Sequence, residues 1–190
     1  MHECCGRQTS RSAPEANMVI RRRLDLSGPG LVFLTTTAKD HFPVFEKKQL
    51  ADIVISQLGE SVRIFRVSLV GYCLMPSHLH LILGFPKIEE LSRFMQSFKS
   101  LSSRKIYQFG SKSDELTKKI AHTRNVWSPR FDDVIIFSEK QFRIKLDYIH
   151  NNPVKAGLAK SAVEWEYSIA VDWLDDKDGL LEIDKEFSWL

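Results

Sequence analysis

Cysteine is scarce in this 190-residue sequence, and long hydrophobic runs are absent. The three cysteines are an odd number, Cys4 and Cys5 are adjacent, and only Cys73 lies in the body of the chain. This pattern argues against a disulfide framework and lacks the ligand spacing of a zinc finger. No run reaches the length of a membrane span, and the N-terminal residues contain no apolar region of a secretory signal. We therefore expect a reduced, cytoplasmic protein without a membrane partner.

A strong charge of one sign is also absent, because 27 Lys and Arg residues oppose 24 Asp and Glu residues. The net charge of +3 permits a polyanionic partner without requiring one. A hydrophobic content of 43% is sufficient for one domain with a core. We divide the chain into a disordered N-terminal segment (1–17), a single domain (18–170) and an acidic C-terminal tail (171–190).

Periodic patterns predict alternating strands and helices along the domain. β-Branched and apolar runs indicate strands over 31–37, 64–74, 78–85 and 134–137. Apolar residues at helical spacing indicate helices over 45–58, 88–109 and 139–151. The third helix is expected to start at Ser138 and to end before Pro153. The order β-α-β-β-α-β-α predicts an α+β fold, an antiparallel sheet with helices packed on one face.

The stretch "PSHLHLIL" places two histidines in an apolar strand that follows a turn. His78 and His80 are two residues apart, so they project from the same face of the strand. Buried imidazoles need hydrogen bonds or a metal ion. Two parallel imidazoles on a strand form half of a site for a divalent ion. Two hydrogen-bonded histidines without a ligand are the alternative.

A second unusual stretch is "IKLDYIHNNPVKAGL". Tyr148 and Asn152 are four residues apart and Lys145 is three residues before Tyr148, so a helix brings all three to one side. A phenol is a poor nucleophile unless a cation assists it. A metal ion held by His78, His80 and the Asn152 carbonyl would polarise a phosphate that faces Tyr148. Alternatively, this is an ordinary amphipathic helix. Two neighbours, Asp147 and His150, are expected to face elsewhere, with His150 at the surface or in a structural position.

Together these segments resemble the single-tyrosine transposases. "MPSHLHLIL" is similar to their histidine–hydrophobe–histidine motif, and "LDYIHNNPVKAGL" is similar to the helix that carries their nucleophilic tyrosine. "VWSPRFDDVII" resembles the strand entry W-x-x-R-F of the same IS200-like family. The resemblance covers about residues 31–167, and the nearest branch is the REP-associated tyrosine transposases.

The resemblance implies a ferredoxin-like or RRM-like sheet that cleaves and rejoins single-stranded DNA through a 5′-phosphotyrosine. His78 and His80 would bind Mg²⁺ or Mn²⁺, and Tyr148 would be the nucleophile. Asn152 would be the third ligand, with Asn151 as its competitor. The substrate would be single-stranded DNA beside a hairpin, and the protein would be a monomer or a homodimer.

Basic residues are candidates for DNA contact, although each is also consistent with a solvated surface charge. An arm of three arginines (21–23) is a further candidate, and Trp127 or Phe131 would either stack on bases or pack in the core. The candidates for DNA contact are Arg93, Lys99, Arg104, Lys105, Arg130 and Lys145.

Two other functions compete with the transposase. The first is a nucleic-acid-binding module of the same fold that has lost catalysis. The second is a phosphoesterase that uses the histidine pair to activate water, which would leave Tyr148 without a role and would form no protein–DNA adduct.

Overall fold

The computed structural model describes residues 27–110 and 126–187. The short 3-10 helices are η1 (Lys39–His41), η2 (Val44–Glu46), η3 (Ile88–Glu90) and η4 (Ala162–Glu164). Expectations for residues 1–17 and for the arginine arm lie outside the described residues. The strands and α-helices are β1 (Gly30–Thr37), α1 (Lys48–Phe65), β2 (Ser68–Met75), β3 (His78–Phe85), α2 (Leu91–Gly110), β4 (Asp132–Ile136), α4 (Glu139–Lys155) and α5 (Ala170–Leu174).

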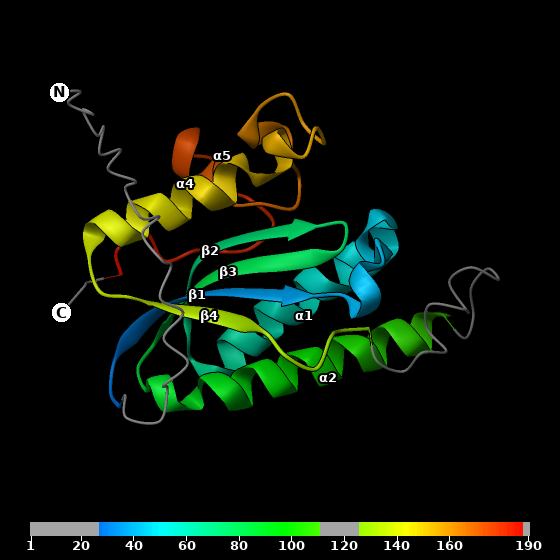
Figure 1. Ribbon diagram of the computed structural model, residues 1–190, viewed down its shortest axis with the longest axis horizontal. Helices are drawn as coiled ribbons and strands as arrows, with labels where there is room; N and C mark the ends of the chain where they lie inside the picture. Colours follow the sequence, from blue (N-terminus) through cyan, green and yellow to red (C-terminus); the bar gives the residue numbers. More distant parts are fainter. Residues whose placement is uncertain (1–26, 111–125, 188–190) are drawn as a thin grey trace, which may run out of the picture.

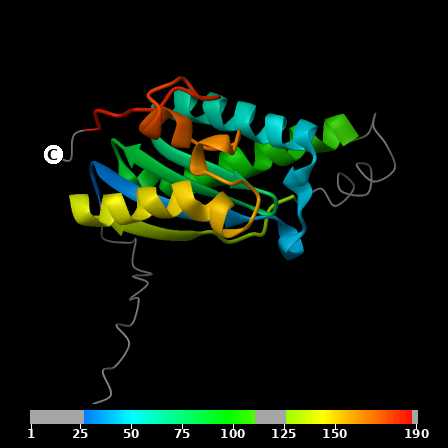
Figure 2. The same cartoon turned by 90° about the horizontal axis from the view of Figure 1, so that it is seen from above.

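The four strands form one antiparallel sheet in the order β2-β3-β1-β4 (Figure 1). This confirms the predicted α+β fold. Two of the helices, α1 and α2, cover one face of the sheet as expected, whereas α4 lies across the opposite face (Figure 2). The reason is that β3 is buried on both sides, so the histidine face also needs a cover.

Side chains alternate between the two faces of β3. Leu79, Leu81 and Leu83 are fully buried, and Phe85 on the same face contacts Phe94 of α2 with ring centroids 5.6 Å apart. The even-numbered residues, including the two histidines, therefore point toward α4. The central position of β3 between β2 and β1 gives the histidine face a rigid support on both sides.

Helix α1 continues to Phe65, so the prediction of a strand from residue 64 is wrong for its first residues. Arg66 adopts a left-handed conformation with φ 53° and ends the helix. The N–H of Val67 then donates to the carbonyl of Val62, as in a Schellman motif. Glycine usually occupies this left-handed position, and an arginine there gives no signal of a helix end in the sequence.

Helix α4 begins where the sequence predicts, since the Ser138 hydroxyl accepts a hydrogen bond from the Gln141 N–H. The predicted end before Pro153 is wrong, because the helix runs through the proline to Lys155. Gly157, at φ 70°, follows the last turn. Pro153 lies in the last turn, and the helix ends two residues after it. Asn152 therefore remains part of the helix.

The segment after α4 covers the outer edge of β2. Its main chain pairs with that strand, because the Leu74 N–H donates to Tyr167 and the Ile169 N–H donates to Tyr72. The indole N–H groups of Trp165 and Trp173 donate to carbonyls of β2, and the Asp184 N–H donates to Leu69. Helix α5 and the acidic residues that follow it, as far as residue 187, pack on the domain. An exposed edge strand is thereby avoided on this side.

The described helices include none with the length and hydrophobicity needed to cross a bilayer.

The absence of a side chain at Gly84 lets Phe187 of the C-terminal segment pack closely against β3. A Cβ added at Gly84 would overlap the ring of Phe187. We expect Gly84→Ala to displace this ring and to lower the free energy of unfolding by about 1–3 kcal/mol in urea titrations. In a Phe187→Ala background the same alanine should cost much less. Equal costs in both backgrounds would contradict this packing arrangement.

Candidate functional site

The two histidines of β3 lie side by side on the face that α4 covers. Their ring centroids are 4.7 Å apart, and His80 is only 3% exposed whereas His78 is partly exposed. Each Nδ1 atom faces a hydroxyl oxygen. Thr35 Oγ1 lies 2.9 Å from Nδ1 of His80, and Ser77 Oγ lies 3.2 Å from Nδ1 of His78. The pair is therefore held in a defined orientation.

Burial keeps both imidazoles neutral. Burial, with smaller contributions from the charges of His78 and Lys145, lowers the pKa of His80 to about 3. Burial, and then the neighbouring His41, also lowers the pKa of His78. Neutral rings retain a nitrogen lone pair at physiological pH, which is the form that binds metal ions.

An amide of α4 completes the group. Asn152 Nδ2 lies 3.0 Å from Nε2 of His80, whereas the side-chain amide of Asn151 donates to the Asp147 carbonyl at the exposed side of the helix. Of the two asparagines, Asn152 is the one that meets the histidines. An amide presents oxygen or nitrogen to the same place after rotation of its last bond.

The donor set fits a divalent ion only if the amide takes part. Within 27–110 and 126–187, no group of three or more His, Cys, Asp or Glu residues is arranged to hold a metal. The candidates are therefore two neutral imidazoles and the Asn152 oxygen. Three protein donors are fewer than the roughly six that Mg²⁺ takes, so phosphate oxygens and water have room to complete the coordination shell.

Tyr148 stands beside this group and remains 40% exposed. Its ring packs edge-on against His80 with centroids 5.1 Å apart. It also contacts Phe33 of β1 at 5.9 Å, and Phe33 stacks on His80 at 5.7 Å. The Lys145 ammonium lies 4.6 Å from the centre of the same Phe33 ring. Of the three residues that the sequence placed on one side of a helix, Tyr148 and Asn152 contact His80, and Lys145 contacts Phe33.

Phe33, which touches His80, Tyr148 and Lys145, is not among the site residues predicted from the sequence. The same is true of Thr35. In the sequence these residues belong to an unremarkable β-branched and apolar strand. Only the register, which pairs Thr35 with His80, identifies them as part of the site.

The cations of α2 lie on the other side of the sheet from Tyr148 (Figure 2). Arg93 packs over Phe65 of α1 at 5.8 Å, and Lys105 forms a 2.7 Å ion pair with Glu60 of α1. Arg104 is exposed on the same helix. These residues are candidates for DNA contact from the sequence, and the structure separates them from Tyr148 by the sheet. A helical pattern does not reveal which face of a sheet the helix covers.

Lys99 has an internal role. Its ammonium, whose pKa is lowered by burial, donates to the main-chain carbonyls of Ser128, Pro129 and Arg130. It therefore holds the segment that leads into β4, while the exposed Arg130 side chain belongs to that segment. Among the predicted basic contacts, Lys145 packs over Phe33, the ring that touches His80 and Tyr148.

The remaining aromatic and histidine candidates have structural positions. Trp127 is buried between Phe45 and Phe98, and its indole N–H donates to Ser102, so the core alternative holds for it. Phe131 is partly buried. His150 is buried, which selects the structural alternative over the surface one. Asp147 is exposed, as its helical position predicts.

The other tyrosines lie away from the histidines. Tyr72 is fully buried in β2 on the α1 side, and the Tyr167 hydroxyl donates to Asp52 of α1. Tyr107 belongs to α2.

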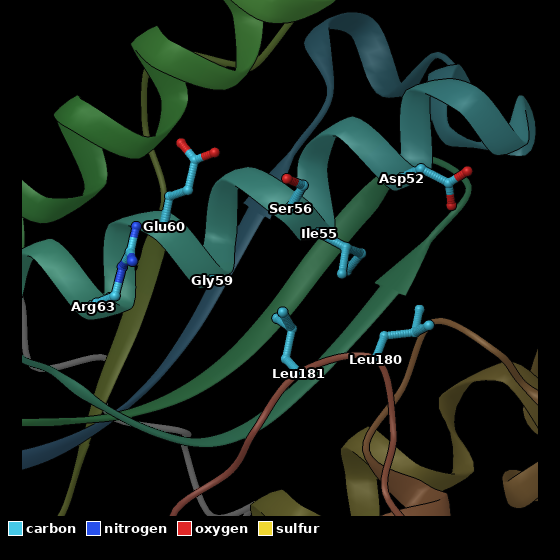
Figure 3. Close-up of a pocket in the computed structure, with 8 residues that line it drawn as sticks. All are labelled: Asp52, Ile55, Ser56, Gly59, Glu60, Arg63, Leu180 and Leu181. Carbon is cyan, nitrogen blue, oxygen red and sulfur yellow. The ribbon is translucent and has the colours of Figure 1, made fainter.

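A pocket of about 450 Å³ lies between α1 and the C-terminal segment (Figure 3). Asp52 and Glu60 line it, together with Arg63 and the exposed Leu180. Both carboxylates already have cationic partners, Lys48 and Lys105. The pocket contains no histidine and no tyrosine, so it does not share the chemistry of the group on the opposite face.

Comparisons with known proteins agree with the resemblance. The chain is 25% identical over 154 residues to a Haemophilus influenzae protein that carries the provisional name REP-associated tyrosine transposase, a match that covers 77% of this chain and 82% of that protein. It is 27% identical over 119 residues to the REP-associated tyrosine transposase of Escherichia coli, covering 56% of this chain and 62% of the relative.

A solved structure described as a REP-associated tyrosine transposase bound to a REP hairpin has the same fold. It aligns with a TM-score of 0.61 and 21% sequence identity over 86% of this chain and 93% of the other. The family model "Transposase IS200 like" matches residues 32–152, which include His78, His80, Tyr148 and Asn152. The chain therefore belongs to the family of IS200-like transposases.

Proposed function

We propose that this protein cleaves and rejoins single-stranded DNA through a covalent bond to Tyr148, at sites beside hairpins. The observation that carries the proposal is the packing of a partly exposed Tyr148 against His80, which in turn meets Asn152. A nucleophile and a neutral donor set for a cation thus share one surface. Family membership supports the same class of reaction.

The reaction is a transesterification that conserves the phosphodiester bond energy. The phenolic oxygen of Tyr148 attacks phosphorus, a tyrosine O–P bond forms, and the P–O3′ bond breaks. The phenolic proton ends, directly or through solvent, on the leaving 3′ oxygen. The products are a 5′-phosphotyrosine and a free 3′-hydroxyl, and attack by a second 3′-hydroxyl reverses the step and joins two strands.

The residues of this chain have separate tasks in that step. His78, His80 and Asn152 would hold a divalent ion, Mg²⁺ or Mn²⁺, which would supply Lewis acidity toward the phosphate. The ring contacts with Phe33 and His80 orient Tyr148. Lys145 places a positive charge beside the same surface, where it offsets the negative charge of the DNA backbone.

The comparison supports hairpin-flanked DNA as the substrate. The solved relative is described as bound to a REP hairpin, which makes DNA of this kind the first choice of substrate. The proposed chemistry is compatible with a monomer or a homodimer, because one chain contributes both the histidines and Tyr148.

The nucleophile can be tested with labelled single-stranded DNA that carries hairpins from the sequence flanking the gene. With Mn²⁺ or Mg²⁺, the protein should form a slowly migrating, protease-sensitive band on a denaturing gel. Tyr148→Phe should abolish this band because the attacking oxygen is removed. Tyr167→Phe, whose hydroxyl lies at α1, should retain it.

The outcome also separates the competing functions. Cleavage without an adduct, unchanged in Tyr148→Phe, would assign a phosphoesterase. Binding of hairpin-flanked DNA without any cleavage would indicate a nucleic-acid-binding module that has lost catalysis.

The third metal ligand can be tested with the two neighbouring asparagines. We expect Asn152→Ala to raise the Mn²⁺ concentration for half-maximal adduct formation by about 10-fold or more, since an inner ligand is lost. Asn151→Ala removes the same amide from the exposed side of the helix and should change this concentration little. The reverse ranking would make Asn151 the ligand. Chelation of the metal should abolish the adduct in all three proteins.

The DNA contact of Lys145 can be tested through the salt dependence of binding. Lys145→Gln removes the charge and retains most of the chain length over Phe33. We expect it to reduce the slope of log affinity against log salt by about 1. Lys105→Gln on α2, where the ammonium is paired with Glu60, should leave the slope unchanged. A larger effect at Lys105 would place the DNA on the α2 side.

A further inference from the structure

The central histidine of the site is held from behind by a hydroxyl group of β1. Thr35 and His80 are direct partners in the β1–β3 register, and the Thr35 Oγ1 and His80 Nδ1 atoms are 2.9 Å apart. His80 is 3% exposed, so water has little access to replace this contact. The hydrogen bond is therefore a built feature of the sheet.

The partners of the ring determine which nitrogen carries its hydrogen. The Asn152 amide lies 3.0 Å from Nε2 of His80, the nitrogen that faces α4. When Nε2 supplies its lone pair to a metal ion, a neutral ring has its hydrogen on Nδ1 and donates it to the Thr35 hydroxyl oxygen. This tautomer directs the Nε2 lone pair toward α4, where Asn152 and Tyr148 lie.

His78 has an equivalent arrangement with a weaker support. Its Nδ1 lies 3.2 Å from the hydroxyl of Ser77, the preceding residue in the turn between β2 and β3. Both rings therefore have Nδ1 next to a hydroxyl oxygen, and each is left with Nε2 as the second nitrogen. Only the support of His80 comes from a different strand.

We propose that Thr35 is a positioning residue for the metal site, acting through His80 by fixing its tautomer and its ring orientation. This inference rests on the proposed metal-dependent function. Partners that hydrogen-bond the second nitrogen of a ligating histidine typically contribute about 10- to 100-fold to metal affinity. Thr35 belongs to a part of the sequence with no motif of its own, and its role follows from the strand register.

The test is a Mn²⁺ titration of the metal-free protein without DNA, by calorimetry, on a set of matched variants. Thr35→Val keeps the side-chain shape and removes the hydroxyl, and we expect it to weaken Mn²⁺ binding by about 10- to 100-fold. Thr35→Ser keeps the hydroxyl and should restore binding to within about 3-fold of the wild type. Thr36→Val makes the same change one residue away, on the opposite face of β1, and should have no effect on affinity.

Thr36 is a suitable control because it is fully buried and its hydroxyl has no hydrogen-bond partner in the described part of the chain. The unfolding midpoint of each variant is measured first, and Mn²⁺ affinities are compared only among variants whose midpoints equal that of the wild type. Thr35→Ala, which also lacks the hydroxyl, replaces the valine variant if the valine lowers that midpoint.

A second readout reports the tautomer itself. Two-dimensional ¹H–¹⁵N correlation spectra of the imidazole rings should show His80 with its hydrogen on Nδ1 in the wild type and in Thr35→Ser. In Thr35→Val we expect a mixture of both tautomers. A general loss of stability would not produce this change.

Wild-type Mn²⁺ affinity in Thr35→Val would overturn the proposal, and so would a wild-type ring with its hydrogen on Nε2. Absence of Mn²⁺ binding in the wild type would overturn it as well. Failure of the transposase function is a separate result, namely a protein that binds Mn²⁺ with the expected ranking of variants but forms no adduct through Tyr148.

Discussion

Burial of one imidazole between a sheet and a helix is the constraint on which this site depends. His80 is almost completely buried, so both of its nitrogens need partners from the protein or from an ion. Thr35 satisfies one nitrogen and Asn152 satisfies the other. This single ring of β3 therefore links a side chain of β1 to a side chain of α4. Phe33 adds to this by filling the space between that ring, Tyr148 and Lys145.

The sequence predicted the elements that carry strong local patterns. The strand 78–85 has the predicted bounds, and the pairing of Tyr148 with Asn152 on one helix face follows from their spacing. What the sequence did not reveal depends on long-range geometry. The face of the sheet that α2 covers and the contribution of Phe33 are set by the packing of elements far apart in the chain. Arg66 shows a local failure, because its left-handed conformation is imposed by the helix end rather than indicated by the residue type.

The division of the sheet into two faces also separates the cations of this protein. Lys99 and Lys105 stabilise the structure, one by holding carbonyls before β4 and the other by joining α2 to α1. Lys145 lies against an aromatic ring on the opposite face. An excess of three positive charges is therefore a poor guide to where an anion binds. The position of each cation relative to the sheet is more informative than the total.

Tyr148 and Asn152, the proposed nucleophile and the proposed amide ligand, belong to consecutive turns of one continuous helix, α4. Any tilt or sliding of this helix over the sheet moves Tyr148 and Asn152 together, since no hinge separates them. A movement of α4 that takes Asn152 away from the histidines therefore takes Tyr148 away at the same time. A displaced α4 would produce a fully inactive state, rather than a protein that retains the ion and cleaves DNA with water.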